Sequence, residues 1–168
     1  MYDREDKLQI EELDRPFTSA EISKTISSLQ RHKSSDFSNN VSDFFIDANH
    51  FISPYLVNVF NKIFDTGTYP DTWCRGVIVP IHKKGDTRNA SNYRGITLIN
   101  VMAKIFSLAL RNRLNKWCEA EQIYSDSQFG FRDNHSTSDC VFLLHTIIQN
   151  ILNNKSVPLL TIKWHLTQ

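Results

Sequence analysis

The chain has 168 residues, 40% of them hydrophobic, and a formal net charge of +1 at pH 7. This length allows one domain or part of a larger one, and no apolar run approaches the length of a membrane-spanning helix. The 3 cysteines are odd in number and widely spaced, which argues against a disulfide framework. They are typical of reduced thiols in an intracellular protein, nuclear or cytoplasmic. The acidic, polar residues 1–6 do not form a secretory signal.

Charge is unevenly distributed along the chain. Residues 1–71 carry 7 basic and 12 acidic residues, residues 72–116 carry 9 basic residues and one acidic residue, and the remainder carries 3 and 5. A basic middle third is typical of a protein that binds a polyanion such as nucleic acid. The alternative is a basic helix face that only keeps the protein in solution.

The N-terminal region is predicted to contain a linker, a helix and a loop. Residues 1–16 are charged and lack periodicity, so we expect an acidic linker or a frayed terminus there. The segment from Thr18 to Glu21 is a capping box, and the apolar residues that follow it predict a helix over residues 19–30. Residues 31–40 are polar and are predicted to form a loop.

A second helix is predicted over residues 54–66, after an aromatic segment that is expected to be partly helical. Ser53 and Pro54 form a helix start, and Gly67 is a predicted stop. The apolar positions between them recur at helical spacing, so their aromatic rings are expected in the core rather than stacked on bases.

Residues 75–98 are predicted to form a β-hairpin. Val77, Val79 and Ile81 alternate with other residues, which predicts a half-buried strand, and Pro80 favours an edge position. The return strand runs over residues 93–98.

Four cations would gather near one end of this hairpin: Lys83, Lys84, Arg88 and Arg94. Such a cluster suits a polyphosphate, since lysine supplies a point charge and arginine a forked donor. The alternative is a solvated hairpin tip, because clustered charge alone carries no geometry.

The C-terminal half is predicted to contain two helices and a strand. Asn100 caps a helix over residues 101–118, whose Lys104, Arg111 and Arg113 lie off the apolar face and either follow a phosphate backbone or are solvated. A loop follows, in which residues 128–132 form either a glycine turn with two buried rings or a segment close to a ligand. Further elements are a helix over residues 137–153 and a strand over residues 157–164.

Four motifs, in this order and spacing, resemble the fingers of reverse transcriptases from non-LTR (LINE-type) retrotransposons. They are Pro70-x-x-Trp73, the segment Val79–Asp86, the segment Asn92–Leu98, and Gln128-Phe-Gly-Phe-Arg132. The resemblance covers roughly residues 17–155. It implies an α+β fold made of partial fingers and the start of a palm, with about four helices, one basic hairpin and one terminal strand.

The resemblance also implies ligands and the residues that contact them. The triphosphate of a deoxynucleotide would be held by Lys83, Lys84 and Arg94. An RNA template and a DNA primer would lie near Arg31, Lys33, Arg75, Arg88, Gln128 and Arg132. The loop at residues 31–40 departs from the family, because Asp36, Ser38 and Asn39 replace a Gly-x-Asp-Gly turn.

The carboxylates that this chemistry needs are missing. Nucleotidyl transfer uses Mg²⁺ held by at least two converging carboxylates, and Mg²⁺ is expected in the intact parent enzyme. No Asp or Glu follows Asp139, and no Asp-Asp pair occurs. No cysteine pairs with a histidine at the spacing of zinc ligands. We therefore assign no catalytic or metal-binding residue, and predict that this chain alone does not polymerise.

The predicted organisation is an incomplete reverse transcriptase domain over residues 17–158, followed by a divergent, truncated end at residues 159–168. Two other interpretations stay open: a non-catalytic nucleic-acid-binding module, and a poorly folded pseudogene remnant. In the last case, apolar surface on the helix at residues 140–153 and on the last strand would be left uncovered.

Overall fold

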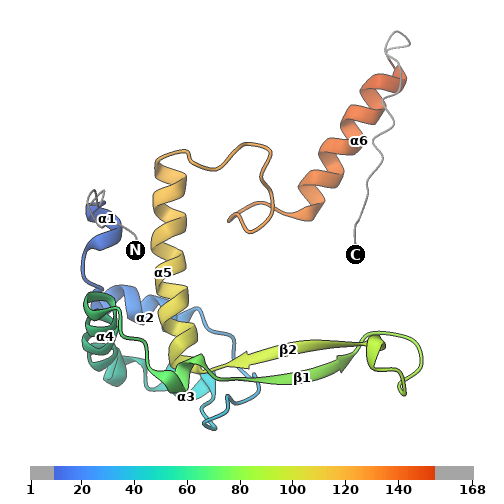
Figure 1. Cartoon of the computed structure of the whole chain (residues 1–168). Coiled ribbons are helices and arrows are strands. Elements are labelled where there is room, and N and C mark those ends of the chain that lie inside the picture. Colours follow the sequence, from blue (N-terminus) through green and yellow to red (C-terminus); the bar gives the residue numbers. More distant parts are fainter. Residues whose placement is uncertain (1–9, 154–168) are drawn as a thin grey trace, which may run out of the picture. The chain divides into compact units, whose positions relative to one another are not determined.

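A computed structural model describes residues 10–153 of the chain (Figure 1). These residues form a mostly helical α+β arrangement that contains four helices of seven residues or more and a two-stranded antiparallel hairpin. The predicted fold class is confirmed to that extent. The chain divides after Trp117 into two compact units. The predicted strand at residues 157–164 lies outside the described residues.

Helix α2 (Ser19–Ser27) begins where the capping box predicts. The Thr18 side chain accepts a hydrogen bond from the Glu21 amide, and the Glu21 carboxylate accepts one from the Thr18 amide at 2.9 Å. The helix ends three residues before the predicted boundary.

The second predicted helix starts earlier than the sequence indicates. Helix α3 (Ser42–Asp47) is followed by α4 (Asn49–Thr66), so Pro54 lies inside a helix instead of at its start. Proline removes one backbone hydrogen bond there. The helix persists because Ile52, one turn ahead of Leu56, packs against the core and extends the buried stripe. Gly67 ends α4 with a φ of 65°, as predicted.

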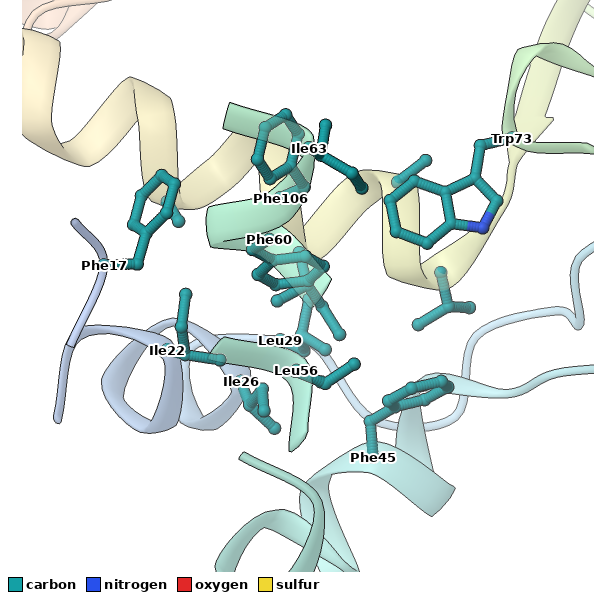
Figure 2. Close-up of a cluster of buried hydrophobic side chains, with 14 residues drawn as sticks. Phe17, Ile22, Ile26, Leu29, Phe45, Leu56, Phe60, Ile63, Trp73 and Phe106 are labelled. Carbon is teal, nitrogen blue, oxygen red and sulfur yellow. The ribbon is translucent and has the colours of Figure 1, made fainter. Parts of the chain in front are cut away.

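Aromatic and branched side chains from α2, α4 and α5 (Val101–Ala120) form the core of the first unit (Figure 2). Phe60 is fully buried, and its ring centroid lies 5.3 Å from that of Phe106 and 6.1 Å from that of Trp73. The prediction that the aromatics of residues 54–66 lie in the core is confirmed for Phe60 and for Phe64, which packs against the core, whereas Tyr55 is 74% exposed. Burial of a large aromatic contributes on the order of 2–3 kcal/mol.

Residues 10–16 contain a short helix and make hydrogen bonds to α5. A short helix, α1 (Glu11–Asp14), is followed by a stretch whose backbone carbonyls accept hydrogen bonds from Arg113 of α5. Arg113 was predicted to lie off the apolar face, yet it is 5% exposed and its guanidinium carbon lies 4.0 Å from the centroid of the Phe17 ring. The expectation failed because the pattern of apolar residues does not reveal a buried cation that binds backbone carbonyls.

The hairpin consists of β1 (Gly76–His82) and β2 (Tyr93–Ile99), which pair antiparallel. The prediction of two strands is confirmed, but that of half-burial is wrong: every residue of β1 is exposed among the described residues, and Ile78 is 69% exposed. A period of two indicates a strand with two different faces, but it does not supply the layer that covers one of them.

The second unit contains a loop and α6 (Thr137–Asn153), which has the predicted bounds. Ser136 and Asp139 form the reciprocal hydrogen bonds of a capping box at its start. Its apolar residues are exposed within the described chain, and Phe142 is 72% exposed. This agrees with the expectation that apolar surface on this helix is left uncovered.

Candidate nucleotide and nucleic-acid interface

The hairpin register brings Lys83 and Arg94 to one face. Ile81 pairs with Arg94, and the Lys83 amide donates a hydrogen bond of 2.8 Å to the Asn92 carbonyl, which extends the ladder by one residue. Because side chains of directly opposed residues point to the same face, Lys83 and Arg94 are diagonal neighbours, about 7–8 Å apart at the backbone. Lys84 follows in the turn.

The tip between the strands is held by its own polar side chains. The Asp86 carboxylate accepts the Arg88 amide at 2.9 Å, and the Asn92 side chain donates to the Asp86 carbonyl at 2.8 Å. Gly85 has a φ of 86°, and a Cβ added there would lie 2.7 Å from Nδ2 of the Asn92 side chain. The tip therefore requires glycine at this position, and its cations project from an ordered turn.

An aromatic pair lies on the other face of the hairpin, near the tip. The His82 and Tyr93 ring centroids lie 5.3 Å apart, and the Tyr93 hydroxyl donates a hydrogen bond of 2.9 Å to the Thr87 carbonyl. The His82 ring also lies 3.0 Å from the Gly85 carbonyl. These contacts connect the strand ends to the turn that carries the cations.

The cations of the hairpin differ from those of the helical core in their partners. Within residues 10–153, no ion pair forms at any of five predicted site residues, which are Arg75, Lys83, Lys84, Arg88 and Arg94. Elsewhere in the first unit, Arg15 and the buried Arg113 both pair with Glu21, and the exposed Lys116 pairs with Glu12. The hairpin cations are therefore left with solvent or a ligand.

Two other predicted site residues are engaged inside the chain. Arg31 pairs with Asp47 at 2.6 Å and with Asp43 at 3.6 Å. Arg132 pairs with Glu119 at 2.9 Å, and their hydrogen bond raises the pKa of Arg132 and lowers that of Glu119. A phosphate would have to compete with these carboxylates, and this ion pairing distinguishes both arginines from the unpaired cations of the hairpin.

The loop around Gln128 has an unexpected geometry. Its alternative interpretation, a glycine turn with two buried rings, does not describe it, since Phe131 is fully exposed and has a φ of 61°. Phe129 is half-buried against the ring of His135 at 5.5 Å. The Gln128 side chain lies 3.5 Å from the Gly130 carbonyl and reaches no other described residue.

Asp36 organises the loop that carries Lys33. Its carboxylate accepts hydrogen bonds from the Ser38 and Asn40 amides and, across 65 residues of sequence, from the Val101 amide at 3.0 Å. Burial alone would raise the pKa of Asp36, but these bonds outweigh it and hold the pKa below its usual value. Asp36 thus replaces the glycine turn of the resembling family with a side-chain turn, which sequence reasoning missed.

Among residues 10–153, no group of three or more His, Cys, Asp or Glu side chains is placed to hold a metal ion. In the same part of the chain, no helix is long and apolar enough to cross a membrane.

No protein-family model matches the chain. It is 34% identical over 99 residues to "Probable RNA-directed DNA polymerase from transposon BS" and 36% identical over 99 residues to the corresponding protein "from transposon X-element", both of Drosophila melanogaster. Each match covers 58% of this chain and 11% of the relative. It is also 28% identical over 138 residues, 82% of this chain and 10% of the relative, to "Transposon TX1 uncharacterized 149 kDa protein" of Xenopus laevis.

The hairpin falls inside these matches. A stretch of 99 residues in a chain of 168 includes β1 and the tip wherever it begins, because it must cover the middle of the chain. The residues that carry the unpaired cations thus lie within the stretch that is aligned with these proteins. The chain spans about a tenth of the length of these relatives, and it is distantly homologous to that segment of the reverse transcriptases of non-LTR retrotransposons.

Proposed function

We propose that this chain is the nucleotide- and template-contacting fingers portion of an RNA-directed DNA polymerase. The observation that supports it most is the difference in ion pairing between the hairpin cations and the core arginines. On the hairpin, Lys83, Lys84 and Arg94 have no acidic partner among the described residues, whereas the core arginines are paired. A triphosphate supplies the negative charge that this group lacks.

Lys83 and Arg94 share one face, and Lys84 adjoins them in the turn. Arginine matches two oxygens of a phosphate with its forked donors, and each lysine adds a point charge that can follow the chain of phosphates. Arg75 and Arg88 would contact the nucleic-acid strand, as would Gln128, while Arg31 and Arg132 would do so only after leaving their carboxylates.

The chemical step would require residues other than those described. In the intact enzyme, Mg²⁺ would supply the charge stabilisation that nucleotidyl transfer needs, and no described group of side chains fits such an ion. The role proposed for this segment is therefore to hold the nucleotide and the template, with an RNA template and a DNA primer as partners of the longer enzyme.

The test is binding of a deoxynucleoside triphosphate to the 168-residue chain. We expect a variant that combines Lys83→Gln, Lys84→Gln and Arg94→Gln to bind dTTP about tenfold more weakly, or more weakly still. An exposed ion pair contributes on the order of 0.2–1 kcal/mol, and a contact between a cation and a triphosphate contributes more than this.

The matched control replaces three exposed cations of the helices, Lys24, Lys62 and Arg111, with glutamine, so that the net charge falls equally. Binding of dTTP should then stay within about twofold of the parent chain. If dTTP binding weakens equally in both variants, the effect comes from net charge alone, and the proposal is contradicted. Salt-sensitive RNA binding without dTTP binding would instead favour a non-catalytic nucleic-acid-binding module.

A further inference from the structure

A cavity of about 390 Å³ with both polar and apolar lining residues lies at the base of the hairpin, where the loop at residues 33–36 meets the end of β2 and the start of α5. Its polar lining residues come from two regions of the chain, residues 33–42 and residues 97–104: Lys33, Ser34, Ser35, Asp36, Ser42, Thr97 and Lys104. Hydroxyl groups and two cations in one cavity are the donors that recognise a phosphate.

The two lysines of this cavity have no carboxylate partner among the described residues. Asp36, the acidic residue of the lining, directs its oxygens to the amides of Ser38, Asn40 and Val101. Four donors therefore satisfy its carboxylate, counting the Asn40 side chain at 3.3 Å, and the lysines are left to a ligand.

A bound anion near Lys104 would be favourable, because the position of this lysine in α5 is electrostatically unfavourable for a cation alone. Lys104 is half-buried and belongs to the first turn of α5, where the positive end of the helix dipole disfavours a cation. The Asn100 side chain already caps the Met102 and Ala103 amides at 2.9 and 3.3 Å. A bound anion would thus be stabilised by the Lys104 charge and by hydroxyl donors, rather than by hydrogen bonds from free helix amides.

We propose that this cavity binds a backbone phosphate of a nucleic-acid strand, with Lys33 and Lys104 as its cations and Ser34, Ser35 and Thr97 as hydroxyl donors. The proposal rests on the proposed function and adds Lys104 as a strand-binding residue. Thr97 lies three residues along β2 from Arg94, about 10 Å away and on the opposite face of the strand, so a nucleic-acid strand that contacts both would pass around the edge of the hairpin. A strand supplies phosphates at both places, whereas a nucleotide has a single polyphosphate group, which the hairpin tip already matches.

The test measures binding of the 168-residue chain to a fluorescein-labelled, 20-nucleotide single-stranded RNA across a range of salt concentrations. For a single strand, each phosphate contact contributes about 0.7 to the slope of log affinity against log salt. We expect Lys33→Gln and Lys104→Gln each to lower that slope by about 0.7, and Lys104→Arg to restore it.

Lys24→Gln is the matched control, because Lys24 is an exposed lysine of α2 that does not line the cavity. Its slope should match that of the parent chain. An unchanged slope in Lys104→Gln, or an equal fall in Lys24→Gln, would overturn the proposal. Lys33 lies on an exposed loop, so Lys33→Gln keeps the test decisive if Lys104→Gln disturbs folding.

Binding of dTTP to the same variants separates this proposal from the proposed function. Lys104→Gln should leave dTTP affinity unchanged, because the triphosphate is assigned to the hairpin tip. If Lys104→Gln weakens dTTP binding and leaves RNA binding unchanged, the cavity is a nucleotide site and the strand proposal is wrong. If the slope test fails while the hairpin variants still lose dTTP, only this further proposal falls.

Discussion

Arg113 is the residue on which the N-terminal half of the first unit depends most. Its guanidinium donates to the Glu21 carboxylate at 3.1 Å and to the carbonyls of Leu13, Arg15 and Pro16, with the Phe17 ring on one side. Five donors in a planar fork can satisfy this many acceptors, and lysine cannot. This single side chain connects α5 to the segment before α2.

We expect Arg113→Met to destabilise the first unit by about 3–5 kcal/mol, because it leaves several carbonyls without their donor and removes one of the two arginines that pair with the partly buried Glu21 carboxylate. The measurement is urea unfolding followed by tryptophan fluorescence. Arg111→Met is the control, since Arg111 is exposed on the same helix and should change stability by about 0.5 kcal/mol or less. Equal losses in the two variants would contradict the role given to Arg113.

Glu21 makes stability depend on pH. Partial burial alone would raise the pKa of Glu21, but hydrogen bonds from Arg113, Arg15 and Thr18 outweigh it and hold the pKa far below its ordinary value. A depressed pKa in the folded state adds stability above the unfolded pKa, about 4.3, and this stability is lost as the pH falls below it.

The free energy of unfolding should therefore decrease between about pH 5 and pH 3, and Glu21→Gln should flatten that decrease. The exposed Glu121 provides a comparison, and Glu121→Gln should leave the pH dependence close to that of the parent chain. An undiminished pH dependence in Glu21→Gln would mean that other carboxylates are responsible.

At the scale of elements, the two capping boxes in the sequence predict helix starts correctly, whereas the start signal at Ser53 and Pro54 does not, since α4 begins at Asn49. The boxes at Thr18 and Ser136 and the Gly67 stop are local, and each is confirmed. Burial of β1 is not local, because it depends on a covering layer that a periodic pattern cannot specify. The shared face of Lys83 and Arg94 is predictable from the hairpin register.

Two parts of the candidate site could not be read from the sequence. The contact from Asp36 to the Val101 amide joins positions 65 residues apart, and nothing in a single sequence marks it. The pairing of Arg31 and Arg132 with nearby carboxylates is likewise invisible in a count of charges. Geometry therefore divides the predicted cations into free and engaged groups.

Replacing Asp36 tests the connection between its loop and α5. Asp36→Ala removes the acceptor for a buried amide, which costs about 1–3 kcal/mol. Hydrogen exchange at Val101, Ser38 and Asn40 should accelerate. Asp47→Ala is a suitable control, because Asp47 is an exposed carboxylate and accepts no amide hydrogen bond in this loop. Unchanged exchange at Val101 in Asp36→Ala would contradict the contact.

Helix α6 offers a second test at this scale. It has no buried residue, in contrast to α4, which buries Leu56, Phe60 and Ile63. Few buried contacts mean a small free energy of local opening. Amides of α6 should therefore exchange faster than those of α4 in the 168-residue chain. Equal protection would show that something covers α6 in solution.

For the whole molecule, the basic middle third and the homology lead to the same interpretation. The stretch aligned with the transposon polymerases includes the hairpin, and the hairpin cations have no acidic partner among the described residues. Within the described residues, large apolar residues of β1 and of α6 are exposed, and the chain spans about a tenth of the length of these relatives.

Hydrogen exchange of the 168-residue chain with and without dTTP tests the nucleotide-holding role. If Lys83, Lys84 and Arg94 hold a triphosphate, adding dTTP slows exchange of amides at residues 82–94 and leaves α2 and α4 unchanged. If exchange at the hairpin tip is the same with and without dTTP, or slows only in the helices, the role assigned to this hairpin is wrong.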